Sequence, residues 1–157
     1  MIKSKFLITC GGLQADRLAK SDGIPLKEKV VAFRGDYYEL EDHAKYKVKN
    51  LIYPVPDPDF PFLGVHFTKM ISGSVEAGPN AVLALAREGY SWQDINFDEL
   101  IESIRYRGLQ KFLIKYPATT IKEFARSLSK KLFVKSLQRL IPEIKEDMLI
   151  KGEPGIR

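Results

Sequence analysis

Three side chains in this sequence have the chemistry and the setting to act on a small carboxylate-bearing molecule: His66, Arg34 and Arg157. An imidazole changes its charge near neutral pH, so His66 could serve as a general base, although a single histidine on a strand commonly has only a structural role. Arg34 precedes a glycine, and Arg157 follows Gly155 and Ile156. A guanidinium beside such a thin backbone can bind a carboxylate through two parallel hydrogen bonds, and a surface ion pair is the alternative for both arginines.

A pair of glycines, Gly11 and Gly12, separates an apolar run over residues 5–10, expected to be a strand, from a stretch with helical spacing over residues 13–20. The order strand, two glycines, helix brings side-chain-free backbone and helix-start N–H groups toward a phosphate or a flat cofactor. The same pair can also form an ordinary tight turn. The sequence contains neither GxGxxG nor GxxxxGK[ST], and no spacing of its His, Cys, Asp and Glu residues suggests a metal site.

The element that must position His66 is an expected strand over residues 62–68. Leu63, Val65 and Phe67 alternate in it and therefore share one face, which is expected to be buried. His66 is expected on the opposite face, where it can meet solvent or a ligand.

A second strand is expected over residues 70–77, where glycine and serine replace bulky residues and let another backbone or a flat ligand come close. Gly78 and Pro79 then predict the start of a helix, because proline suits the first helical position, and Gly89 predicts its end. Further expected elements are a strand over 29–40 with a bulge at 34–35, a polar connection over 41–50, a short strand over 51–53 and a rigid proline-rich loop over 54–58.

After Gly89 the apolar residues recur with helical spacing, and Pro117 and Pro142 divide the helices. Asn96 and Thr120 are each followed three residues later by glutamate, which is the spacing of an N-terminal capping box. The stripe of the helix that starts at Thr120 is expected to be buried, and it consists of Ile121, Phe124 and Leu128. The pattern indicates an α+β fold with a mixed, mainly antiparallel sheet, helices packed on one side of it, and a mostly helical C-terminal half.

The composition is that of one ordinary globular domain of 157 residues, 45% of them hydrophobic. We see no run of about 18 apolar residues and no secretory leader, and the single Cys10 favours a reducing compartment. The net charge of +5 is unevenly distributed, since residues 105–157 hold 13 Lys and Arg against 5 Asp and Glu. That basic third could bind an anionic surface, such as lipid or nucleic acid, or could simply be a set of solvated helical faces.

Several stretches of the sequence resemble the L-2-hydroxyglutarate oxidase/dehydrogenase family, FAD-dependent enzymes of the D-amino-acid-oxidase-like superfamily. The resemblance to the middle of these enzymes rests on RGDYYEL, YPVPDPDFPFLGVHFT and GSVEAGPNAVLALAREGY. LITCGGLQADRLA resembles the segment that follows the last strand of their FAD domain, and SLSKKLFVKSLQRLIPEI resembles their helical insertion. The family's N-terminal dinucleotide fingerprint and its C-terminal Asp-Gly segment are missing, so the resemblance implies a central, substrate-domain portion of an enzyme more than twice this length.

The resemblance implies a division of the chain and a set of site residues. Residues 1–23 would be a remnant of the FAD-binding domain, 24–150 the substrate domain with a helical insertion at about 91–142, and 151–157 the return to the FAD-binding domain. Arg157 matches the arginine of a Gly-x-Arg motif that holds the substrate carboxylate in amine-oxidising relatives, and His66 would be the catalytic base. The other implied positions are Arg34, Tyr37, Tyr53 and Asn80 for the substrate, and Gly11, Gly12 and Leu13 for the FAD.

The implied function is oxidation of a 2-hydroxy acid, with L-2-hydroxyglutarate and its product 2-oxoglutarate first, by hydride transfer to the flavin N5. The chain alone is expected to retain no FAD and to be inactive. Its expected partners are a 2-hydroxy dicarboxylate, the missing FAD-binding portion and, as an option, a membrane surface or quinone, but no nucleic acid. The expected location is cytoplasmic, with a peripheral position at the inner membrane as a further option. Two alternatives stay open: a non-catalytic module that binds an anionic surface through Lys130, Lys131 and Lys135, and an amine-oxidising member of the same superfamily.

Overall fold

The computed structural model describes residues 3–56, 58 and 62–157. Its α-helices are α1 (Ala15–Ser21), α2 (Phe97–Arg105), α3 (Arg107–Lys115), α4 (Pro117–Leu128) and α5 (Lys130–Leu137), with 3-10 helices η1 (Gly12–Gln14), η2 (Asp42–Lys47) and η3 (Glu146–Met148). Its strands are β1 (Phe33–Gly35), β2 (Tyr38–Leu40), β3 (His66–Lys69), β4 (Val75–Gly78), β5 (Val82–Leu83), β6 (Leu149–Lys151) and β7 (Gly155–Ile156). The predicted α+β class and the mostly helical C-terminal half are confirmed.

Two small sheets share the same three passes of the chain. One sheet has the order β5-β1-β7 and the other β3-β4-β2-β6, and all described pairs are antiparallel rather than mixed. Each pass contributes a strand to both sheets, and the first pass changes sheet at Asp36 and Tyr37. The predicted strand over 29–40 is therefore interrupted two residues later than its expected bulge.

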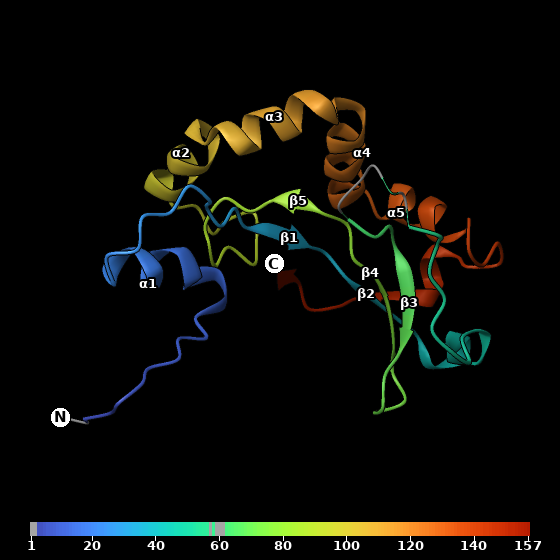
Figure 1. Cartoon of the computed structure of the whole chain (residues 1–157). Helices are drawn as coiled ribbons and strands as arrows, with labels where there is room; N and C mark the ends of the chain where they lie inside the picture. Colours follow the sequence, from blue (N-terminus) through green and yellow to red (C-terminus); the bar gives the residue numbers. More distant parts are fainter. Residues whose placement is uncertain (1–2, 57, 59–61) are drawn as a thin grey trace.

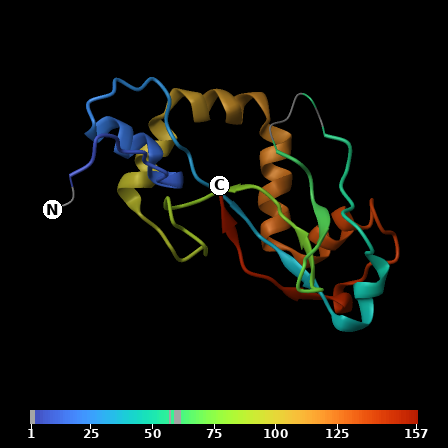
Figure 2. The same cartoon turned by 60° about the horizontal axis from the view of Figure 1, so that its bottom comes forward.

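The hydrophobic core lies between the four-stranded sheet and α5. Phe67, Phe133 and Leu137 are fully buried there, and the Tyr38 and Phe133 rings lie 4.7 Å apart between centroids. Val65 is buried with Phe67, as the alternation predicted, so one face of β3 belongs to the core. Figure 1 and Figure 2 show α2 and α3 arching over the three-stranded sheet toward α4, whereas α1 lies apart, toward the N-terminus.

Helix α4 does not bury the apolar stripe that its sequence predicted. Ile121, Phe124 and Leu128 are 69%, 50% and 63% exposed, whereas Glu123 is buried. The reason is polar anchoring, because Glu123 accepts a hydrogen bond from the Ala81 N–H at 3.1 Å and thereby turns toward the sheets. Glu123 therefore does not act in the predicted capping box with Thr120, because its carboxylate contacts Ala81 instead.

The predicted helix that starts at Pro79 does not form. Gly78 is the last residue of β4, and Val82 and Leu83 form β5 by pairing with Arg34 and Phe33 of β1. The local helix signals were outweighed because an antiparallel partner strand lies alongside these residues, and tertiary pairing commonly overrides propensity. Likewise, the second predicted strand begins only at Val75, after a turn over residues 70–74.

The apolar run over residues 5–10 does not form the strand that its composition predicted. Phe6, Leu7 and Ile8 are all more than 80% exposed, and no described strand lies alongside them to accept their backbone hydrogen bonds. The short strand predicted over 51–53 is reduced to a single bridge between Ile52 and Phe67. In both places the residue types suit a strand and the described structure supplies too few pairing partners.

Candidate functional site

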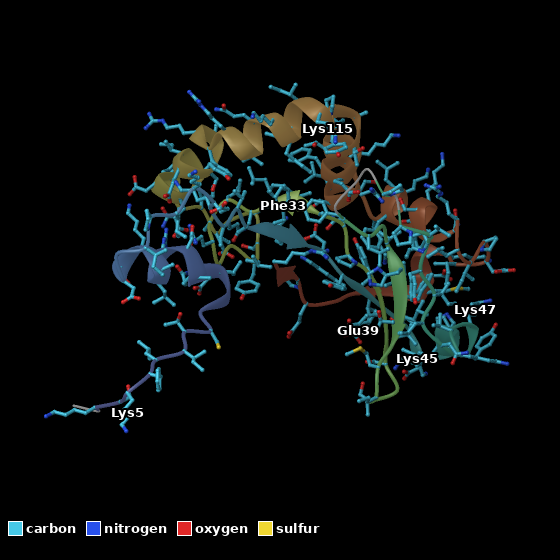
Figure 3. The ribbon with its side chains drawn as sticks, viewed as in Figure 1. Lys5, Phe33, Glu39, Lys45, Lys47 and Lys115 are labelled. Atoms are coloured by element: carbon cyan, nitrogen blue, oxygen red, sulfur yellow. The ribbon has the colours of Figure 1, made fainter. Side chains whose placement is uncertain are left out.

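The bend where the chain passes from one sheet to the other brings together four of the nine predicted site residues, Arg34, Tyr37, Asn80 and Arg157. Tyr37 is the last residue before β2, Asn80 lies between β4 and β5, and Arg157 follows β7. Figure 3 shows Phe33 on β1 and Glu39 on β2, on either side of this bend. Residues far apart in the sequence meet there because three antiparallel passes are in register across both sheets.

His66 lies at the edge of this bend, directly opposite Gly78 in the pairing of β3 with β4. Its neighbours in the strand, Val65 and Phe67, are buried, so the imidazole is on the face that points away from the core. The Nδ1 atom lies 3.0 Å from the carbonyl oxygen of Gly64, and a carbonyl can only accept a hydrogen bond. This contact is a hydrogen bond when Nδ1 carries the proton, and Nε2 of the neutral ring then has the lone pair that could accept a proton.

Tyr37 occupies the space that glycines leave on the neighbouring strands. A Cβ added at Gly78 would lie 3.3 Å from Tyr37 Cδ1, and one added at Gly155 would lie 3.5 Å from Cε2. The Gly152 N–H donates to the Tyr37 carbonyl at 2.9 Å. The space beside these two glycines is thus filled by the ring of Tyr37 and not by an external ligand. Burial raises the pKa of the Tyr37 hydroxyl, the positive charge of Arg157 opposes that shift, and Glu76 adds to it.

Arg157 is held by its backbone and leaves part of its guanidinium available. Its N–H and carbonyl pair with those of Phe33 at 3.0 and 2.8 Å. Its Nη2 donates to the Asn80 carbonyl at 3.5 Å, and the guanidinium carbon lies 5.7 Å from the centre of the Phe62 ring. A long single hydrogen bond satisfies few of the five N–H donors of an arginine, so this side chain retains the capacity to bind a carboxylate.

Arg34 and Asn80 lie inside the fold rather than on its surface. The two are each 2% exposed, and the carboxylate of Asp36 connects them. Arg34 Nε donates to Asp36 Oδ1 at 3.1 Å, while Asn80 accepts from the Asp36 N–H at 2.6 Å and donates to Oδ2 at 3.0 Å. The Arg34 guanidinium also stacks 4.3 Å from the Trp92 ring. These contacts give both residues a structural task, which is to fix the bend on which Tyr37 stands.

The remaining predicted residues lie elsewhere. Tyr53 is 57% exposed and follows the bridge that joins Ile52 to Phe67, beside β3. Gly11, Gly12 and Leu13 lie next to α1, where the Leu13 carbonyl accepts a hydrogen bond from Arg87 Nη1 at 2.5 Å. Figure 1 places α1 and β3 toward opposite sides, with the C-terminal residue between them. The structure therefore places Tyr37 and Arg157 together at the bend, with His66 on the strand that borders it, and keeps the glycine pair separate.

Sequence reasoning missed two acidic residues that organise this region. Asp36 receives hydrogen bonds from Arg34, Asn80 and Ser127, and its one signal was a charged residue within an apolar strand pattern. Glu123 is paired with Arg126, and burial raises the pKa of its carboxyl while that guanidinium opposes the shift. Glu123 had the spacing of a capping residue, so nothing in the sequence pointed to its place against the sheet.

Comparison with known proteins confirms the resemblance noted in the sequence. The chain is 52% identical over 155 residues to an L-2-hydroxyglutarate dehydrogenase of Indibacter alkaliphilus. The aligned residues make up 98% of the chain but 39% of the relative. It is 48% identical to a mitochondrial L-2-hydroxyglutarate dehydrogenase of Nematostella vectensis, covering 99% of the chain and 34% of the relative. It is 41% identical to an L-2-hydroxyglutarate dehydrogenase of Salmonella houtenae, in an alignment that covers 99% of the chain and 37% of the relative. No protein-family model matches the chain. The chain thus spans a little more than one third of the length of the curated relatives that it matches.

Proposed function

We propose that this chain forms the substrate side of an FAD-dependent oxidoreductase that converts L-2-hydroxyglutarate to 2-oxoglutarate. The observation that carries this proposal is the pairing of Tyr37 with Arg157 at the bend, beside the strand that carries His66, in a chain that matches L-2-hydroxyglutarate dehydrogenases over nearly all of its length. A base, a neutral hydrogen-bond donor and a cation are the groups that oxidation of a hydroxy acid requires from the protein.

Each group has a role that its setting supports. Arg157, with its unused N–H donors, would bind the carboxylate next to the reacting carbon, and the Tyr37 hydroxyl would donate to the same carboxylate. His66 Nε2 would take the proton of the substrate hydroxyl, since Nδ1 is occupied by the Gly64 carbonyl. The hydroxyl oxygen loses this proton and the carbon that bears it loses a hydride, so the C–O bond becomes the C=O of the 2-oxo acid. FAD, when bound, supplies the acceptor for that hydride.

The residues next to α1 fit one edge of a flavin nucleotide. Gly12 has a φ of +49°, and a Cβ added to it would have no neighbour within 4 Å. Such an open, side-chain-free backbone permits close approach of a nucleotide, and Gly11, Gly12 and Leu13 would provide it. We expect the chain alone to be purified without flavin absorbance near 450 nm, because these residues can contact only a small part of a dinucleotide. A yellow preparation would contradict this expectation.

A graft tests the proposed reaction. The segment of the Indibacter alkaliphilus relative that aligns with this chain is replaced by this chain, and reduction of bound flavin is followed anaerobically. We expect L-2-hydroxyglutarate to bleach the flavin and His66→Gln to slow bleaching by about 10²- to 10⁴-fold, the range for a lost general base. His43→Gln, which alters an exposed histidine, is the matched control. Bleaching by a 2-amino acid but not by the hydroxy acid would instead establish the amine-oxidising alternative.

A second candidate function, binding to an anionic membrane surface, has its own observation. Residues 103–142 contain ten Lys and Arg but one acidic residue, Glu123, and that residue is buried. Exposed apolar side chains lie among these cations, including Ile114 and Ile121. Basic helices with exposed apolar residues are typical of segments that lie on anionic lipid. No helix in the described part of the chain is long and apolar enough to cross a bilayer.

The cytoplasmic location with a peripheral position at the inner membrane stays a prediction, and several relatives carry the word mitochondrial in their names.

A further inference from the structure

A pocket lies between the residues that lead into β3 and helices α4 and α5. Its volume is about 380 Å³, within the range of roughly 300 to 1,000 Å³ that small-molecule sites occupy. Val65, whose neighbour His66 points the opposite way, contributes to its wall. The pocket adjoins the bend through Phe62, which lines it and whose ring centre lies 5.7 Å from the Arg157 guanidinium carbon.

The pocket has one charged side. Arg126 and Arg139 line it from α4 and from the turn after α5, together with the hydroxyl of Ser136. Among the lining residues that the structure describes, Glu123 is the one acidic side chain, and its carboxylate already contacts Arg126. Counting these described residues, one of the two positive charges has no acidic partner in the pocket.

The two arginines have unused donors. Arg139 forms no side-chain hydrogen bond or ion pair with any residue that the structure describes. Arg126 contacts Glu123 and, at 3.5 Å, Ser136 Oγ, and its buried Nε has no hydrogen-bond partner among the described residues. Buried donors of this kind are rare in folded proteins, so a guanidinium with spare N–H groups at the wall of a pocket points to an oxyanion ligand.

The pocket also has an apolar part. Val55, Val65 and Leu140 line it with aliphatic side chains. A small inorganic anion would leave this surface wet, whereas a ligand with an apolar body would cover it. We propose that the pocket binds a free monocarboxylate with a short apolar body, whose carboxylate lies against Arg126 and Arg139 and whose body lies against these three residues.

The probe for this site is 4-phenylbutyrate, and its matched neutral control is 4-phenylbutan-1-ol, both titrated into the chain by calorimetry. We expect saturable binding of the acid, and binding of the alcohol weaker by about tenfold or more, because a hydrogen bond to a charged group contributes roughly 1.5 to 3 kcal/mol. Equal affinity for the acid and the alcohol, or no saturable binding of the acid, would overturn the proposal.

Arg139→Gln identifies the place of binding, because Arg139 is exposed and its loss leaves no buried partner unpaired. We expect this variant to bind the acid about tenfold more weakly than the wild type and to bind the alcohol with unchanged affinity. Lys135→Gln removes an equal charge from α5 outside the pocket and is the matched control. An equal loss in both variants would mean attraction to overall charge and would reject the site. This outcome is independent of flavin reduction in the graft, so the two proposals can fail separately.

Discussion

Arg87 and Asp16, 71 residues apart in the sequence, form a two-pronged ion pair that joins α1 to the loop after β5. Arg87 Nη1 lies 2.5 Å from Asp16 Oδ1, and Nη2 lies 2.7 Å from Oδ2. Both side chains are largely buried. The hydrogen bonds from Arg87 lower the pKa of the Asp16 carboxyl from 3.8 to about 2, although burial acts in the opposite direction. The N-terminal glycines therefore owe their place to a contact that a single local pattern could not reveal.

Asp16→Asn should lower the free energy of unfolding by about 2 kcal/mol at neutral pH, the equivalent of the pKa shift. Because the folded-state pKa is depressed, this stabilisation is complete above the unfolded value of 3.8 and is lost as the pH falls through about 2. Urea unfolding of wild type and variant between pH 2 and 7 measures it. Asp147→Asn, at an exposed carboxylate, is the control and should change stability by less than about 0.5 kcal/mol. A difference that stays constant over this pH range would contradict the assignment.

Gly78→Ala should be strongly destabilising. Gly78 has a φ of +143°, and an added Cβ would lie 2.9 Å from the Asp36 carbonyl oxygen and 3.4 Å from the Phe133 ring. We expect a loss of about 3 kcal/mol or more, since backbone strain and overpacking each cost roughly 1 to 3 kcal/mol. Gly73→Ala separates the two effects, because Gly73 also has a positive φ but has no atom within 4 Å of the added Cβ. If both variants unfold at the same urea concentration, close packing at Gly78 is not the cause.

Arg34→Met should destabilise the chain by about 3 to 5 kcal/mol, the usual cost of removing one partner from a buried ion pair. The variant leaves the Asp36 carboxylate without its cation and removes the guanidinium from the face of Trp92. Trp92 is the only tryptophan in the sequence, so its fluorescence in the folded state should also change. Arg105→Met removes an exposed arginine for comparison. Unchanged fluorescence together with unchanged stability would show that Arg34 does not serve as a structural link.

The basic helices should retain the chain on anionic vesicles at low salt. Lys131→Gln with Lys135→Gln should weaken binding to phosphatidylserine vesicles by about thirtyfold, at roughly 1 kcal/mol for each lysine. Lys130 is left unchanged because its Nζ donates to the Leu149 carbonyl at 2.7 Å and has a structural role. Lys27→Gln with Lys49→Gln removes the same charge from exposed sites outside the helices. Co-sedimentation that is absent at low salt, or that falls equally in both double variants, would remove the second candidate function.

The sequence alone determined those features that depend on the period of a single element. The alternation of apolar residues predicted that Val65 and Phe67, on either side of His66, are buried and hence that His66 points away from the core, because side chains on a strand alternate. The N-cap at Asn96 was also predictable, and its side chain accepts the Glu99 N–H at 3.2 Å. The resemblance carried by the central motif identified the relatives, since it depends on residue order and not on shape.

Only the tertiary structure decided which elements find a partner. Val82 and Leu83 form a strand because β1 lies beside them, and residues 5–10 do not because no described strand does. Helix α4 turns Glu123 inward because the N–H of Ala81, 42 residues away, is there to be satisfied. The same holds for the site, where Tyr37 fills space left by Gly78 and Gly155 on two other strands. Such contacts depend on the register of distant segments, and local propensity is too weak to encode that register.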